Sequence, residues 1–124
     1  MTFAELLNQQ WAGYADRHRN KVNLLIHIVT VPLVWIAGFQ VVGSLLLLLS
    51  GLGAFKILVW AVILIAVALF AQSHGNSMEA TKPAPFTHWK DFAMNAAAEQ
   101  FVTFPRFVLT GHWLRHLAGM RSKE

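Results

Sequence analysis

The chain has 124 residues, of which 56% are hydrophobic and 13% are charged, and it carries a formal net charge of +4 and no cysteine. This length suits one domain and the charged share is about half that of a typical soluble domain, so we expect a single membrane-embedded, all-helical domain over residues 1–124. Disulfides, thiolate nucleophiles, iron–sulfur clusters and cysteine zinc sites are excluded, and the positive charge is too sparse for nucleic acid but suits an anionic lipid headgroup or a fatty carboxylate.

Residues 1–18 are expected to form an amphipathic helix on the membrane surface. Apolar residues recur there at steps of three and four, namely Phe3, Leu6, Leu7, Trp11 and Tyr14. This spacing gives the helix one apolar face, and Trp and Tyr side chains suit the membrane interface.

Residues 22–50 form the first apolar region. Between Val22 and Leu49 the polar side chains are Asn23, His27, Thr30, Gln40 and Ser44. A continuous helix of this length would measure about 42 Å, which exceeds the ~30 Å hydrocarbon core of a bilayer. Pro32, Gly38 and Gly43 offer places to kink or break it. The region is therefore one long bent span, or a span followed by a short re-entrant piece.

The second span is predicted at residues 56–73, and a loop with Pro83 and Pro85 at residues 74–90. Residues 91–120 return to helical spacing, so we expect an amphipathic helical region that bends at Pro105.

Basic residues flank the two spans. Arg17, Arg19 and Lys21 precede the first span, and Lys82, Lys90, Arg106 and Arg115 follow the second. The positive-inside rule places both flanks and both termini in the cytoplasm, most simply with a hairpin of two crossings. A full extra crossing at residues 38–53 would instead put the flanks on opposite faces.

Three histidines come to one membrane face in this hairpin: His18 before the first span, His27 inside it and His74 at the end of the second. An ionisable residue within a span is costly and usually marks a function or a partner, and burial favours the neutral imidazole that binds metal. His27 taken alone is equally well explained as a packed imidazole that is hydrogen-bonded to a neighbouring group such as Asn23.

A carboxylate can complete this cluster. Glu79 follows His74 by five residues, and two or more histidines with one carboxylate suit non-haem Fe(II) and O₂ chemistry. An interfacial Glu79 paired with Lys82 is the alternative. His112 and His116 form a rival pair on one helix face, for which contact with lipid headgroups is the favoured interpretation.

Several motifs resemble those of one known family. They are Tyr14-x-x-x-His18-Arg19-Asn20-x-x-Asn23-x-x-x-His27-x-x-x-x-Pro32, Gln72-Ser73-His74-Gly75 and Glu79-x-x-x-Pro83-Ala84. From Tyr14 to Phe107 the chain resembles the small membrane proteins, long classed as a domain of unknown function, that include the fungal endoplasmic-reticulum dioxygenase of 2-hydroxy fatty acid α-oxidation. The run AEQFVTFPRFVLTGHW is similar to a short bacterial-type branch of that family.

This resemblance implies an Fe(II)-dependent reaction with O₂ that shortens a 2-hydroxy long-chain fatty acid by one carbon. It implies that His18, His27 and His74 are the catalytic iron ligands, with Glu79 as a further ligand. Two other classes stay open: a haem protein with His27 and His74 as axial ligands, and a non-enzymatic membrane scaffold whose histidines only pack.

A 2-hydroxy acid can chelate Fe(II) through its carboxylate and hydroxyl oxygens, which orients the bond that breaks. Arg19, Lys21 or Arg106 could balance the charge of the substrate carboxylate. The acyl tail is expected to enter from the lipid and to lie between the spans or along the aromatic surface of Phe101, Phe104 and Phe107.

Overall fold

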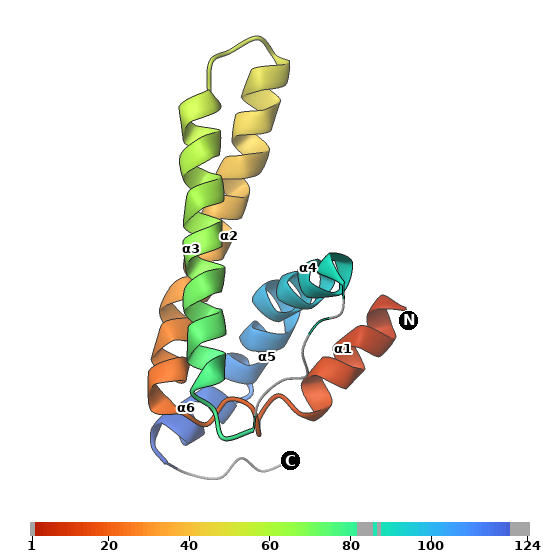
Figure 1. Ribbon diagram of the computed structural model, residues 1–124, viewed down its shortest axis with the longest axis vertical. Coiled ribbons are helices and arrows are strands. Elements are labelled where there is room, and N and C mark those ends of the chain that lie inside the picture. Colours follow the sequence, from red (N-terminus) through yellow and green to blue (C-terminus); the bar gives the residue numbers. More distant parts are fainter. Residues whose placement is uncertain (1, 82–85, 87, 120–124) are drawn as a thin grey trace.

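The computed structural model describes residues 2–81, 86 and 88–119, and within these residues the chain is all helical, as predicted. Two long helices form an upright hairpin, and the shorter helices gather around its lower part (Figure 1). The elements in chain order are α1 (Phe3–Ala12), α2 (Lys21–Leu49), α3 (Phe55–Ser77), α4 (Trp89–Ala98), the π-helical turn η1 (Glu99–Thr103), α5 (Phe104–Leu109) and α6 (His112–Leu117).

Helix α1 is shorter than the helix expected over residues 1–18. It begins with a capping box, in which the Thr2 hydroxyl accepts from the Glu5 N–H and the Glu5 carboxylate accepts from the Thr2 N–H. It ends at Ala12 before Gly13. The turns that follow direct Tyr14 and His18 into the protein, where both side chains are buried.

Helix α2 is a single continuous helix rather than a span followed by a re-entrant piece. The Asn20 side chain caps it by accepting from the N–H groups of Val22 and Asn23. Pro32 lies inside the helix without ending it. In apolar surroundings the backbone N–H and C=O groups are best hydrogen-bonded within the helix. Continuing the helix past one proline therefore costs less free energy than ending it there.

Helix α3 runs antiparallel to α2 and continues to Ser77, beyond the predicted end at residue 73. The turn between the helices contains Gly51 with a φ of 78°, a left-handed conformation that glycine adopts without strain. Small residues, among them Ala37, Ala61 and Ala68, are buried in the hairpin and allow the two helices to approach closely. The predicted loop residues Lys82, Pro83 and Pro85 lie outside the described residues.

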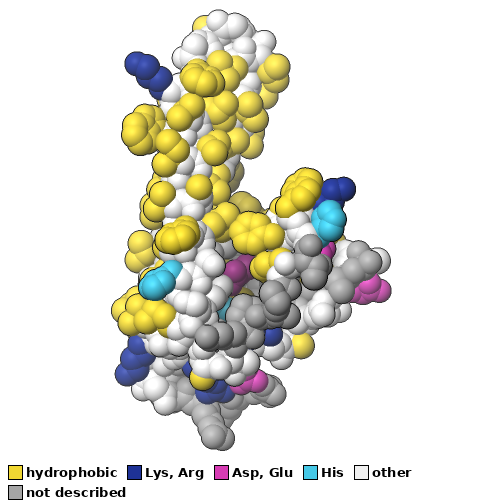
Figure 2. Space-filling view, viewed as in Figure 1, with side chains coloured by type: hydrophobic (Ala, Val, Ile, Leu, Met, Phe, Trp, Pro, Cys, Tyr) yellow, Lys and Arg dark blue, Asp and Glu magenta, His cyan; other side chains and the backbone are white. Residues whose placement is uncertain are grey.

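Both helices of the hairpin are long and apolar enough to cross a membrane. Their side chains are exposed on the upper part of the hairpin; Phe39 is 77%, Leu49 85% and Trp60 69% exposed. Figure 2 shows these apolar side chains over the upper hairpin, whereas most of the visible charged side chains lie on the lower part of the molecule. A continuous exposed apolar surface of this kind marks contact with a membrane or a partner.

The C-terminal region, which was expected as one amphipathic region over residues 91–120, is divided into α4, η1, α5 and α6. A buried pair of amides joins this region to the hairpin: Gln72 Nε2 donates to Gln100 Oε1 at 2.9 Å, and Gln100 Nε2 donates to Gln72 Oε1 at 2.6 Å. Gln72 Nε2 also donates to the hydroxyl of Thr30 on α2. The indole N–H of Trp35 donates to the Gln100 carbonyl at 2.7 Å. Four polar side chains thus fix η1 against both long helices.

Replacing Gln72 with Leu should lower the free energy of unfolding by about 2 kcal/mol, because the buried Gln100 amide then lacks its partners. Gln100→Leu should lower the free energy of unfolding by a similar amount. The double variant should lose less than the sum of the two single losses, since neither amide is then left unpaired. Equilibrium unfolding in detergent, followed by circular dichroism, measures the three values, and strictly additive losses would contradict the pairing.

Candidate metal centre

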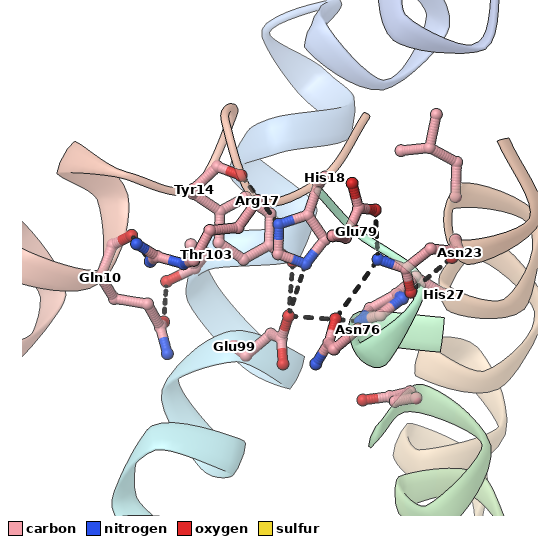
Figure 3. Close-up of polar contacts among 12 residues, drawn as sticks. Gln10, Tyr14, Arg17, His18, Asn23, His27, Asn76, Glu79, Glu99 and Thr103 are labelled. Atoms are coloured by element: carbon pink, nitrogen blue, oxygen red, sulfur yellow. Dashed lines mark hydrogen bonds and ion pairs between the residues drawn. The ribbon is translucent and has the colours of Figure 1, made fainter. Parts of the chain in front are cut away.

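Three metal-capable side chains from distant parts of the chain converge at the base of the hairpin. His18 lies between α1 and α2, His27 on α2, and Glu99 at the start of η1. The Nε2 atoms of both histidines are 3.3 Å from Glu99 Oε2, and one ligand atom from each of the three residues lies within 4.8 Å of the other two. Figure 3 shows the Glu99 carboxylate facing both rings.

The other ring nitrogen of each histidine fixes its orientation. His18 Nδ1 is 2.8 Å from the Tyr14 carbonyl and His27 Nδ1 is 3.0 Å from the Asn23 carbonyl. A carbonyl oxygen only accepts, so both Nδ1 atoms carry the hydrogen. In the neutral rings, Nε2 therefore presents its lone pair toward the other ligand atoms, which is the orientation that metal-binding histidines adopt.

The two Nε2 atoms are buried and, among the residues that the structure describes, have no hydrogen-bond partner, although each has an ion-pair contact with Glu99. Two nitrogen lone pairs that face a carboxylate oxygen repel it, so this arrangement needs a positive charge among the three groups. A proton on Nε2 is one solution. A metal ion is another, and it would give both nitrogens and the carboxylate a partner at once. The residues present therefore fit a metal bound by two imidazoles and one carboxylate.

Glu99 stays ionised in this setting. Burial would raise the pKa of its carboxyl, but hydrogen bonds from the His18 and His27 rings, and the positive charge of these rings when they are protonated, outweigh burial and hold this pKa well below its usual value. The Tyr14 hydroxyl donates to Glu99 Oε2 at 2.7 Å. Burial first, and then the Glu99 charge, raise the pKa of Tyr14 well above its usual value, so the hydroxyl remains a donor.

Aromatic rings enclose the three residues. The Tyr14 ring stacks on His18 with a centroid distance of 3.7 Å. The ring centroid of Phe104 lies 5.6 Å from that of His27, and the ring centroid of Phe107 lies 6.0 Å from that of His18. Both phenylalanines are buried. This apolar wall keeps water from much of the centre and strengthens the electrostatic interactions inside it.

The π-helical turn η1 explains the placement of Glu99. The N–H of Phe104 donates to the Glu99 carbonyl five residues earlier, which is the π-helical pattern. Pro105, the next residue, cannot donate, and its ring would press on the preceding turn of an ordinary α-helix. Widening that turn accommodates the proline, and single π-helical turns of this kind occur frequently at functional sites.

Glu79, predicted as a ligand, occupies a different position. Its buried carboxylate accepts from the backbone N–H groups of Arg19 and Asn20 and, at 2.6 Å, from the Asn23 side chain. A carboxylate at the N-terminus of α2 also interacts favourably with the helix dipole. The structure therefore uses Glu79 to hold the chain between His18 and His27. Its alternative partner, Lys82, lies outside the described residues.

His74 lies on an exposed part of α3. Its neighbour Gly75 faces α2 so closely that a Cβ there would be 2.3 Å from Asn23 Oδ1. Successive residues on a helix point about 100° apart, so His74 is turned away from that contact. The three-residue metal-capable group found among the described residues does not include His74. His74 is exposed whereas His27 is fully buried, and the haem alternative with these two ligands stays a prediction.

The remaining predicted residues are distributed around the centre. Arg19 pairs with Asp16 at 3.1 Å, Lys21 is exposed, and the Arg106 guanidinium lies 4.1 Å above the Trp11 ring. Phe101 is 56% exposed, whereas Phe104 is buried. Their roles toward a substrate stay predictions.

His112 and His116 also contact other groups in the structure. His112 Nδ1 contacts the Thr110 hydroxyl at 2.7 Å, whereas the buried His116 places its Nδ1 2.7 Å from the His18 carbonyl. His116 thus helps to hold the backbone that carries His18.

Sequence reasoning missed Glu99 and Tyr14 as members of the centre. The available signal was the run Ala98 to Trp113, in which Glu99 is the one acidic residue among apolar and aromatic ones. Tyr14 was part of the quoted motif, four residues before His18, but it was interpreted as an interfacial side chain.

The family model described as "Mpo1-like: 2-hydroxy-palmitic acid dioxygenase Mpo1-like" matches residues 4–105, which is most of the chain. The match includes His18, His27 and Glu99, and it confirms the family resemblance of the sequence motifs. No curated protein and no solved structure matches the chain.

Removing a ligand of this centre should abolish tight metal binding. His27→Ala and Glu99→Gln should each weaken Fe(II) binding by about 100-fold or more, since loss of a residue that only orients a ligand already costs about 10- to 100-fold. His74→Ala is the matched control and should bind as the parent does. Anaerobic Fe(II) titration of the purified protein measures all three. If Glu79→Gln weakened Fe(II) binding as much as Glu99→Gln does, Glu79 would have to be counted as a metal ligand.

Tyr14→Phe keeps the ring stacked on His18 but removes the donor to Glu99. Fe(II) affinity should fall by about 10-fold, because the carboxylate loses the hydrogen bond that orients it. The same titration checks this value, and circular dichroism confirms that the variant is folded. An unchanged affinity would remove Tyr14 from the orienting role.

Proposed function

The chain belongs to the Mpo1-like family, and from this premise we propose that it is a membrane-embedded, Fe(II)-dependent dioxygenase that shortens 2-hydroxy long-chain fatty acids by one carbon. The description of the family names a dioxygenase and 2-hydroxy-palmitic acid. The observation that carries the proposal is the convergence of His18 Nε2, His27 Nε2 and the Glu99 carboxylate in a buried site.

The donor set supports iron as the metal. Two imidazole nitrogens and one carboxylate with open coordination positions are the arrangement of non-haem Fe(II) oxygenases. When bound there, Fe(II) supplies the Lewis acidity and the redox chemistry with O₂ that no side chain of this protein can supply.

The protein's own residues hold the centre in place. The carbonyls of Tyr14 and Asn23 fix the ring orientations of His18 and His27. The Tyr14 hydroxyl orients the Glu99 carboxylate. Because these partners are in place before a substrate arrives, little reorganisation is needed during the reaction.

The overall reaction is balanced with O₂ as the only oxidant. A 2-hydroxy acid and one O₂ give the acid one carbon shorter, carbon dioxide and water. The bond between C1 and C2 breaks, C2 becomes the new carboxyl carbon, and O₂ accepts four electrons.

In the membrane, α2 and α3 would form the two crossings of a multi-pass protein, with the centre at the interface beside the basic flank. Arg17 and Arg19 lie just before α2 and Lys21 begins it, whereas Lys56 lies near the hairpin tip. The excess of positive charge at the base supports a cytoplasmic location for that end and for both termini. A long-chain substrate dissolved in the bilayer would then reach the centre without leaving the lipid.

Purified protein loaded with Fe(II) should convert 2-hydroxypalmitate under O₂ to the acid one carbon shorter. Mass spectrometry of the product formed under ¹⁸O₂ measures the conversion and should find one labelled oxygen in the new carboxyl group. Glu99→Gln should lower turnover by about 100-fold or more, in line with its loss of metal, while His74→Ala stays active. Iron binding without conversion of any 2-hydroxy acid would refute the proposed reaction, and absence of both would favour a scaffold.

A further inference from the structure

An apolar groove lies between the hairpin and α4. Its volume is about 310 Å³, and Val34 and Gly38 of α2, Ile65 and Leu69 of α3, Phe92 of α4 and Phe101 of η1 are among the residues that line it. Figure 2 shows a hollow between the hairpin and α4 with apolar side chains around it and an acidic side chain at its floor.

The groove lies next to the segment that carries Glu99, and it begins one helical turn above Val31 on α2. On α2, His27, Val31, Val34 and Gly38 follow one another at steps of four, three and four residues, so they lie on one face of the helix. On the opposite wall, Ala96 and Gln100, which flank Glu99, line the groove. The Glu99 side chain is 14% exposed. One end of the groove therefore lies beside Gln100, the residue after Glu99, and the other lies beside Gly38.

The length of this path matches a long acyl chain. Gly38 lies eleven residues after His27, which is about 16 Å along a helix. An extended hydrocarbon chain with bonds of about 1.5 Å advances roughly 1.25 Å per carbon, so about 13 carbons cover the distance. A sixteen-carbon 2-hydroxy acid with its first two carbons at the metal centre would end close to Gly38.

We propose that this groove binds the acyl chain of the 2-hydroxy acid and that Gly38 sets its length, with the methyl end of the chain lying beside this glycine. The proposal rests on the proposed function, because it assumes that the carboxyl end lies at the metal centre. Its occupant is a hydrocarbon chain without polar substituents, since apolar side chains form most of the walls and the Gln100 amide is already paired with Gln72.

The chain offers a matched pair of variants. A Cβ at Gly38 would meet no atom within 4 Å, so Gly38→Leu would extend into the groove without displacing the protein. A Cβ at Gly43 also meets no atom within 4 Å, and Gly43, in the same helix, is not among the groove residues. Both changes replace a helical glycine and favour the helix to a similar extent, by about 1 kcal/mol.

The test uses photoaffinity labelling and turnover in detergent. A sixteen-carbon 2-hydroxy acid with a diazirine near its methyl end should label α2 around residues 34–38 and α3 around residues 65–69 in the parent protein and in Gly43→Leu. Gly38→Leu should lose about 10-fold of this labelling, and its turnover should shift by a similar factor from sixteen-carbon toward ten-carbon acids.

Labelling confined to other surfaces, or unchanged labelling and chain-length preference in Gly38→Leu, would overturn the groove assignment. Labelling is measured without catalysis, so it separates the two proposals. If no 2-hydroxy acid is converted but the parent and Gly43→Leu are labelled as expected and Gly38→Leu is not, the dioxygenase assignment fails and the groove assignment stands.

Discussion

A carboxylate buried against two imidazole nitrogens is the interaction on which the rest of this structure depends. Glu99 Oε2 receives the Tyr14 hydroxyl and faces both Nε2 atoms, and the Nδ1 atoms are already committed to carbonyls. This geometry leaves a negative charge and two lone pairs in a site with little water. Such a site needs a positive charge, supplied by a proton on Nε2 or by a bound metal ion. The three segments that supply these groups are held together by that requirement.

Polar contacts hold the elements together around the centre, and apolar contacts hold the rest of the hairpin. Glu79 ties the end of α3 to the start of α2, and the paired amides of Gln72 and Gln100 tie η1 to the hairpin. Both sets are buried and well satisfied, which gives them a single preferred geometry. Higher in the hairpin the contacts between the two helices are made mainly by small apolar residues, and the side chains on the outer faces are exposed. Rigidity is thus concentrated at the base, where the metal-capable side chains converge.

Hydrophobic patterning predicted the two long helices and the burial of His27, because both depend on composition along the chain. Patterning did not show that Glu99, rather than His74, joins His18 and His27 at the centre. Helix α3 is apolar nearly all round, so periodicity identifies no buried face on it. The face is decided by the close approach of Gly75 to Asn23, which is a tertiary contact. Glu99 reaches the histidines through the π-helical turn, and residue spacing carries no information about that shift.

The positions of the ligands along the chain also set an order of assembly. His18 and His27 are synthesised before the hairpin is complete, whereas Glu99 follows both long helices. A nascent chain would present a pair of imidazoles without the carboxylate and without the wall formed by Phe104 and Phe107. Iron held so loosely in contact with water and O₂ would be prone to damaging side reactions. If the centre binds iron as proposed, the late position of Glu99 would delay firm iron uptake until the C-terminal helices have closed around the site.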